Sequence, residues 1–271
     1  MTVLEPARSS LDTSRPFTTA QAVAAGIDPA RLRSREFRRL AKGKYVSSAR
    51  TEDRSLHVEA VLLGHRAEAF ASHWTAARFY RLPVTLDPGD DVSVLDPALR
   101  RRRTGVRSHV VPAETEVLEH DGVRVASPAC VFVQLAAHLP LVDLVVVGDF
   151  MVRKGWYSPE QLLDACRRSR APHAGKARRA ARFVRRGVDS PMETRLRMLL
   201  VLAGFPEPEV NHLLVDADGV VHRRFALCYR GVRVLVEYDG RHHVELVEQW
   251  DRTATSTAGR SSTRTPGASS S

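Results

Sequence analysis

The sequence predicts an α+β protein made of several small domains. Helix-start signals, in which Ser or Thr stands three residues before Gln or Glu, occur at Thr18, Ser158 and Ser190. Between these signals, Asp91 to Leu95 and Val106 to Val111 are rich in β-branched residues, which indicates strands. The chain has 271 residues, enough for one to three domains with apolar cores.

The first predicted domain covers residues 17–52 and follows a polar segment, residues 1–16, which we expect to be flexible. A short helix begins at Thr18 and ends at Gly26, and Asp28-Pro29 begins a second helix that runs to about Glu36. Gly43 then separates two short segments, as in a hairpin. Seven basic residues of this domain are suited to contact nucleic-acid phosphates: Arg31, Arg33, Arg35, Arg38, Arg39, Lys42 and Lys44. The alternative is a small helical cap with a solvated charged face.

The string AQAVAAGIDPARLRSREFRRLAKGKYV resembles the N-terminal winged helix of AbiEi-type antitoxins, which belong to type IV toxin-antitoxin systems. Further along, ASHWTAARFYRLP and RVASPACVFVQLA resemble the middle domain of the same proteins. The resemblance implies a winged helix-turn-helix over residues 17–52 and a mixed α/β middle domain over residues 55–170. It also implies DNA as a partner, together with a cognate toxin or another protein from a neighbouring gene.

Within the middle domain, helices are predicted at His57 to Ala69, Ser72 to Tyr80 and Ser127 to Leu139, and another begins at Ser158. Ser72-His73 has no aspartate partner at a meaningful spacing, so we expect a helix cap followed by a partly buried histidine. Residues 171–187 predict a basic connector helix with a narrow apolar stripe. We interpret it as a solvated linker, and a nucleic-acid contact surface is the alternative.

In the C-terminal part, Arg230-Gly231 is a plausible two-residue turn between two strands. This turn places Phe225 opposite Val236 and Arg224 opposite Glu237. Side chains alternate along a strand, so one face carries Arg224, Ala226, Leu235, Glu237 and Asp239. Two carboxylates about 6 to 7 Å apart along a strand could bracket a hard divalent cation. The place of a third carboxylate holds Ala226.

The order of these segments, Glu193 on a helix, then RRFALCY, VEYDG and His243, resembles the PD-(D/E)XK endonuclease superfamily, in particular a Vsr-like branch. The resemblance implies an incomplete restriction-endonuclease-like α/β domain over residues 188–252. It maps Glu193, Glu237, Asp239 and His243 onto vestigial catalytic positions. Glu237 and Asp239 would form an incomplete metal site, because Ala226 replaces the aspartate that is the principal ligand of that branch. Mg²⁺ is the expected cofactor if any nuclease activity survives.

Structural roles for the same residues remain open. Glu193 is also the last residue of a Ser190 capping box, and Glu237 opposite Arg224 is compatible with a cross-strand ion pair. His242-His243 lacks the spacing and the cysteine partner of a zinc site.

Residues 253–271 predict a disordered tail, because they contain no aliphatic residue larger than alanine. Their Arg, Thr, Ala, Ser and Gly are also typical of GC-rich DNA read out of frame. One back-translation of Thr253 to Ser262 yields GDIDRREEL in another frame, which resembles the helix that follows Glu-Gln-Trp in the endonuclease-like family. A frameshift product and an ordinary disordered tail are both open explanations.

Composition limits the function classes. The formal net charge is +10, from 41 basic and 31 acidic residues, which favours polyanions or an anionic membrane surface as partners. Three widely spaced cysteines argue for a reducing cytoplasm. The N-terminus lacks the apolar region of a secretory signal, and the longest apolar stretch, Leu139 to Val152, is too short to span a bilayer. A cytoplasmic protein without a membrane partner is therefore expected.

The leading hypothesis is a DNA-binding protein of the antitoxin or transcription-regulator type that carries an inactive endonuclease-like domain. A magnesium-dependent DNA endonuclease is the first alternative. A protein-interaction module with a basic surface is the second.

Overall fold

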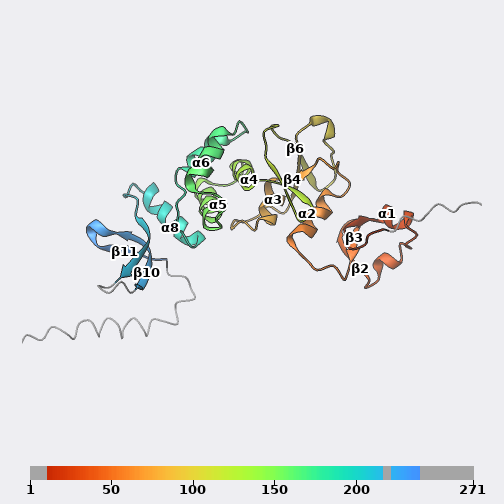
Figure 1. Cartoon of the computed structure of the whole chain (residues 1–271), viewed down its shortest axis with the longest axis horizontal. Helices are drawn as coiled ribbons and strands as arrows, with labels where there is room; N and C mark the ends of the chain where they lie inside the picture. The colour runs from red at the N-terminus through yellow and green to blue at the C-terminus, as the bar shows by residue number, and fades with distance from the viewer. Residues whose placement is uncertain (1–10, 216–220, 239–271) are drawn as a thin grey trace, which may run out of the picture.

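The computed structural model describes residues 11–215 and 221–238, and within them the chain is an α+β protein with three separate sheets. Figure 1 shows the elements in three groups along the longest axis, with β2 and β3 at one end, α4 and α5 in the middle, and β10 and β11 at the other end. The predicted tail, residues 253–271, and the motif residues Asp239 and His243 lie outside the described residues. No described helix has both the length and the apolar character needed to cross a membrane.

The N-terminal group is a small sheet in the order β1-β3-β2 with one short helix. Its elements are β1 (Phe17–Thr18), α1 (Thr19–Ala24), the 3-10 turn η1 (Arg31–Arg33), β2 (Phe37–Ala41) and β3 (Lys44–Ser47). The predicted capping box of α1 is present, since Thr18 Oγ1 accepts from the Gln21 N–H at 3.2 Å and Gln21 Oε1 accepts from the Thr18 N–H at 2.8 Å. The predicted hairpin is also present: β2 and β3 are antiparallel, and Gly43 takes the left-handed conformation at φ +70°.

The predicted helix from Pro29 to Glu36 is wrong, because the chain forms only η1 before Ser34 becomes extended. Leu32 is buried, but the residues three and four positions later, Arg35 and Glu36, are charged and exposed. A further helical turn would therefore have no apolar face to bury. Phe37 instead begins β2 and packs edge-on against Phe17, with the ring centroids 5.5 Å apart.

The middle group is a five-stranded mixed sheet in the order β6-β5-β4-β8-β7, with helices packed around it. Its strands are β4 (Phe70–Ala71), β5 (Asp90–Val94), β6 (Val106–Val110), β7 (Val117–His120) and β8 (Val123–Ala126). Its helices are α2 (Arg54–Leu62), α3 (His73–Phe79), η2 (Pro97–Leu99), α4 (Pro128–Leu135), α5 (Leu141–Arg153), α6 (Pro159–Arg168) and α7 (Ala174–Ala181). The predicted helix His57 to Ala69 is shorter than expected, because Gly64 takes φ +85° after α2 and β4 follows.

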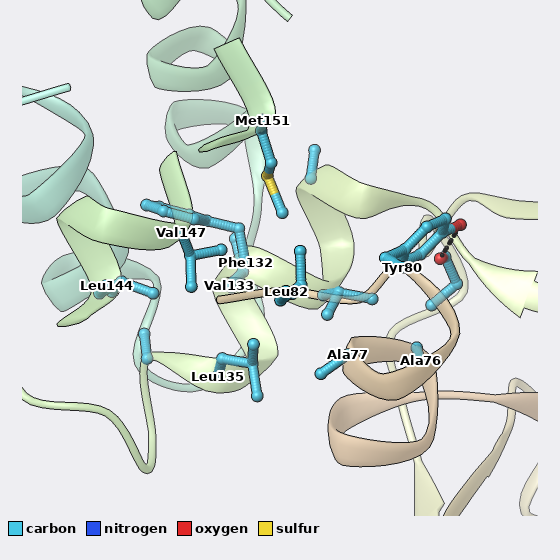
Figure 2. Packing of buried hydrophobic residues seen from close by; sticks show 14 of the residues in the cluster. Ala76, Ala77, Tyr80, Leu82, Phe132, Val133, Leu135, Leu144, Val147 and Met151 are labelled. Atoms are coloured by element: carbon cyan, nitrogen blue, oxygen red, sulfur yellow. Dashed lines mark hydrogen bonds between the residues drawn. The ribbon is translucent and has the colours of Figure 1, made fainter. Parts of the chain in front are cut away.

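The core of the middle group includes residues of α3, α4 and α5 and extends to α6, α7 and the sheet. Figure 2 shows Phe132 and Leu135 on α4, Leu144 and Met151 on α5, and Tyr80 directly after α3. Among them, Phe132, Leu135, Leu144 and Met151 are 0% exposed. Burial of one such side chain contributes about 1.5–3 kcal/mol, so this cluster is a main source of stability in the described residues.

The basic segment from residue 171 to 187 is not a solvated linker. Its helix α7 packs against α5 and α6, and Ala177, Ala180, Ala181 and Val184 are 0–2% exposed within the main core. The predicted apolar stripe is therefore correct, but it is a core face. Small alanine side chains allow the close approach of α7 to its neighbours, and Arg179 and Arg182 stay in solvent.

The C-terminal group contains α8 (Pro191–Leu202), β9 (Glu209–Val215), β10 (Val221–Tyr229), the 3-10 turn η3 (Arg230–Val232) and β11 (Val234–Val236). The three strands are antiparallel in the order β11-β10-β9. The predicted pairing of Phe225 with Val236 is wrong, since Leu227 pairs with Val236. A longer connection, η3 followed by Arg233 at φ +56°, replaces the two-residue turn. Because the register moves by an even number of residues, every side chain keeps its predicted face.

A buried ion-pair network joins α8 to α5. Asp149 Oδ2 accepts from Arg197 Nη2 at 3.0 Å and from Thr194 Oγ1 at 2.8 Å, while Asp149 Oδ1 accepts from the Arg185 N–H at 2.8 Å. Arg197 is 0% exposed, and its Nη1 also donates to Glu207 at 2.9 Å. Burial raises the pKa of Asp149, and the charge of Arg197 opposes that rise. The network fixes α8, and with it Glu193, against the middle group.

Candidate functional site

Three residues of the predicted site, Glu193, Ala226 and Glu237, line one cavity of about 270 Å³. This Ala226 cavity lies where the N-terminus of α8 meets β10 and the end of β11. The observed pairing of Leu227 with Val236, continued by one residue, brings Ala226 next to Glu237. The remaining lining residues are Asp189, Ser190, Asn211, Arg224 and Tyr238. The structure therefore gathers the described part of the predicted site, while Asp239 and His243 lie outside the described residues.

Glu193 belongs to the N-terminal cap of α8 and also lines the Ala226 cavity. The Ser190 hydroxyl caps α8 by accepting from the Glu193 N–H at 3.2 Å. In return, the Glu193 carboxylate accepts from the Ser190 hydroxyl at 3.0 Å and from the Asp189 N–H at 3.0 Å. The pKa of Glu193 is raised, mainly by burial and to a smaller extent by the neighbouring Glu237 carboxylate. Two carboxyl groups that repel each other are thus held at one cavity, an arrangement that a cation would relieve.

A cation of the chain itself already lies at this cavity. The Arg224 guanidinium forms an ion pair with Asp189, and its Nε donates to Asn211 Oδ1 at 2.9 Å. Asn211 takes the left-handed conformation at φ +55°, which Asn tolerates better than most residues. The Arg224 charge supplies fixed positive potential beside Glu193 and Glu237, where a metal-dependent enzyme would use an ion.

The cavity is a poor metal site as far as the described residues form it. Mg²⁺ requires near-octahedral coordination by oxygen atoms that face the ion, and both carboxylate oxygens of Glu193 already accept hydrogen bonds, from the Ser190 hydroxyl and the Asp189 N–H. Ala226 offers only a methyl group to the cavity, and Asp189 is engaged by Arg224. Glu193 and Glu237 line the same cavity, but the described residues place no third carboxylate there apart from Asp189.

The seven predicted nucleic-acid-binding residues fall into two groups. Three of them are used within the fold: Arg31 donates to Glu36 twice at 2.7 Å, Arg38 donates to Glu52 at 3.3 Å, and the Lys44 ammonium donates to the Ala60 carbonyl of α2. Burial lowers the pKa of Lys44, and the charge of Arg103 lowers it further. The other four are exposed and have no carboxylate partner within the described residues: Arg33, Arg35, Arg39 and Lys42.

A second polar cluster, which was not predicted from the sequence, is formed by His73, Asp91 and His109. Asp91 is 1% exposed, and His109 Nε2 lies 2.8 Å from its Oδ1. Arg107 donates to both oxygens of Asp91, at 2.9 and 2.8 Å. The His73 and His109 rings stack with centroids 4.1 Å apart, and both line a cavity of about 530 Å³, the His109 cavity.

The sequence contains only a weak signal for this cluster. Asp91 and Ser93 are two positions apart in β5, and Arg107 and His109 are two positions apart in β6. Each pair therefore lies on one face of its strand. Parallel pairing of Ser93 with His109 brings the two faces together. Alternating polar residues in strands that flank a core were the available clue, but the pairing of the strands is a long-range property.

Protonation states also distinguish the members of the cluster. Burial, and then the proximity of His109, lowers the pKa of His73 to about 3, so its ring is neutral at physiological pH. Burial opposes ionisation of Asp91, but hydrogen bonds from His109 and Arg107 outweigh burial and lower its pKa. The three side chains offer ligand atoms within 4.8 Å of one another, as a metal ion would require. However, Arg107 already neutralises Asp91 through both of its oxygens. A metal ion there would find no free carboxylate charge and would be repelled by the guanidinium.

Comparisons with known proteins give no assignment, since no protein-family model matches the chain and no curated protein matches its sequence.

Proposed function

We propose that this protein is a DNA-binding regulator of the antitoxin type, with a winged-helix-like N-terminal domain and an endonuclease-like C-terminal domain that does not cleave. The observation that carries the binding role is the set of exposed cations Arg33, Arg35, Arg39 and Lys42. They lie on η1, the segment after it and the β2–β3 hairpin, and no described carboxylate neutralises them. Such cations bind duplex DNA by replacing the counterions of its phosphates.

Contact with DNA is then made through the hairpin and the segment before it rather than through a long recognition helix. The chain forms only a 3-10 turn where a recognition helix was expected. Backbone contacts of this kind position a protein on DNA without reading its sequence. Sequence preference then has to come from few side chains or from DNA shape.

The absence of cleavage is supported by the composition of the Ala226 cavity. An attacking water beside a scissile phosphate requires a metal ion held by fixed oxygen ligands. In place of a third ligand, the cavity has the Ala226 methyl group and the Arg224–Asp189 ion pair. The Arg224 guanidinium would still attract a phosphate, so the domain would still be able to contact DNA.

The binding role is tested by the salt dependence of the dissociation constant for a duplex, measured by fluorescence anisotropy. Replacing Arg33, Arg35 and Lys42 with alanine should flatten the slope of log Kd against log salt by about 2.7, or about 0.9 for each phosphate that the variant no longer neutralises. A control with the same charge change replaces Arg66, Arg153 and Lys154, which are exposed elsewhere. Equal slopes for the two triple variants would remove the hairpin from the DNA interface.

A magnesium-dependent endonuclease is the second candidate function. One observation favours it, namely that Glu193 and Glu237 line the same cavity. A nuclease would need Asp239 or another oxygen ligand to complete the ion's coordination. Cleavage assays with the unaltered protein separate the two candidates.

A further inference from the structure

The His109 cavity adjoins a second, strongly basic hollow. The His109 cavity lies between β6, α4 and the connection from α6 to α7. The neighbouring arginine cavity, of about 680 Å³, lies along the same connection and the start of α7. The two share four lining residues: Arg168, Ser169, Ala171 and His173. The two cavities are therefore neighbours, and a ligand that extends past these four residues would contact both.

The two ends of this combined site differ in charge. At the β6–β7 connection, Glu114 and Glu116 line the His109 cavity. At the opposite end, the arginine cavity is lined by arginines and by no carboxylate residue. The rest of the His109 cavity wall is largely apolar and includes Val111, Ala129, Val133, Ala137 and Ala165. The complementary ligand has hydrogen-bond donors at one end, an apolar or aromatic body, and an anionic group at the other end.

The arginine cavity is built to hold an anion. Arg168, Arg170 and Arg178 line it and have no ion-pair partner within the described residues, whereas Arg167 pairs with Asp164 at 3.0 Å. Guanidinium groups match the geometry of phosphate oxygens. The first residues of the eight-residue helix α7, Ala174 and Gly175, also line the cavity, so the positive end of the helix dipole adds to the field.

The histidine pair supplies a flat wall for an aromatic body. His109 is 30% exposed at its side chain, and its orientation is fixed by Asp91. His73 stacks behind it, which keeps the ring from rotating. Stacking of a base on an aromatic ring contributes to nucleotide binding without regard to base identity. A cavity of about 530 Å³ is also of the size that encloses small-molecule ligands.

We propose that this combined site binds a nucleoside phosphate. The phosphate contacts Arg168, Arg170 and Arg178, the base lies against the His109 wall, and Glu114 and Glu116 accept hydrogen bonds from amino or hydroxyl groups. The nucleoside phosphate is either a free nucleotide or the terminal nucleotide of a nucleic acid. This site shares no residue with the β2–β3 hairpin, so nucleotide binding here does not depend on the proposed DNA contact.

The test is isothermal titration of the full chain with adenosine and guanosine monophosphates, with adenosine and inorganic phosphate as partial ligands. We expect one nucleotide per chain and binding at least about tenfold tighter than either partial ligand, because both halves of the site are then filled. Arg178→Ala should weaken binding about tenfold or more, because a charge-assisted hydrogen bond to the phosphate is removed. Arg179→Ala, one position further on the exposed side of α7, is the matched control and should bind as the unaltered protein does.

A second variant tests the apolar part independently of charge. Ala137 is exposed at the cavity wall, so Ala137→Trp fills the His109 cavity without disturbing the buried core, and circular dichroism should show an unchanged fold. This variant should lose nucleotide binding and keep weak binding of inorganic phosphate. The triple variant that replaces Arg33, Arg35 and Lys42 is also titrated with a 5′-phosphorylated oligonucleotide. Tighter binding of the oligonucleotide than of the free nucleotide indicates the end of a nucleic acid as the ligand, and weaker binding indicates a free nucleotide. No nucleotide binding at millimolar concentration, or equal losses in Arg178→Ala and Arg179→Ala, would overturn the proposal.

Discussion

The middle group of elements and the C-terminal sheet contrast in how they bury their apolar residues. In the middle group, Phe132, Leu135 and Leu144 are 0% exposed. At the C-terminal end, Leu199 is 66% exposed and Phe205 is 59% exposed. The described C-terminal elements therefore do not enclose a core of comparable completeness. The buried Asp149–Arg197 ion pair attaches α8 to α5 of the middle group, and α8 carries Glu193 of the Ala226 cavity.

The largest effect should come from breaking that attachment. Asp149→Ala leaves the fully buried Arg197 without its main counter-charge, which should lower the free energy of unfolding by about 3–5 kcal/mol. Asp143→Ala is the control, because its ion pair with Arg195 is partly exposed and should contribute about 0–1 kcal/mol. Urea denaturation of both variants measures the difference. Similar losses would mean that the buried network does not fix α8.

The contrast in packing predicts different costs for the same substitution. Leu135→Ala creates a cavity in the middle core and should lower the free energy of unfolding by about 2–5 kcal/mol. Leu199→Ala removes a mostly exposed side chain and should change it by about 0.5 kcal/mol or less. Thermal and urea unfolding are suitable measurements. A loss at Leu199 as large as that at Leu135 would show that α8 is covered in the protein in solution.

The middle group should also be the acid-sensitive part. Because the pKa of His73 is about 3 in the fold and about 6.5 in the unfolded chain, only the unfolded chain takes up this proton between these values. The free energy of unfolding should therefore fall by about 2 kcal/mol between pH 7.5 and pH 5 on account of His73. His73→Asn, which also suits the positive φ of this position, should reduce that fall. An identical pH dependence in the variant would assign the acid sensitivity to other groups, such as His65, whose pKa is also lowered.

Local signals in the sequence predicted local structure well. The Thr18 and Ser158 capping boxes and the Gly43 hairpin form as expected, because the hydrogen bonds or backbone angles they require involve only neighbouring residues. The Ser190 cap also forms, although the Glu193 carboxylate accepts from the Asp189 N–H instead of the Ser190 N–H. The shared face of Arg224, Ala226 and Glu237 was predicted, because alternation along strands survives a register change of two residues.

Contacts between residues far apart in the chain could not be predicted from the sequence in the same way. The basic composition of α7 suggested solvent exposure, but its alanines pack in the core because α5 and α6 present a matching surface. Asp91 and His109 meet His73 only after two parallel strands have paired. The Arg224–Asp189 ion pair likewise joins segments far apart in the chain, so nothing in its local sequence marks it.

The most direct test of DNA binding without cleavage combines both measurements on one sample. The purified chain, at a concentration that saturates a plasmid or duplex, is incubated with Mg²⁺ or Mn²⁺, and the DNA is then resolved on a denaturing gel. Because the Ala226 cavity lacks a third available carboxylate among the described residues, we expect the DNA to be bound and to remain intact. Ala226→Asp should increase Mn²⁺ affinity, as measured by calorimetry. Metal-dependent cleavage by the unaltered protein that disappears in Glu237→Gln would contradict the proposed inactivity and establish the endonuclease.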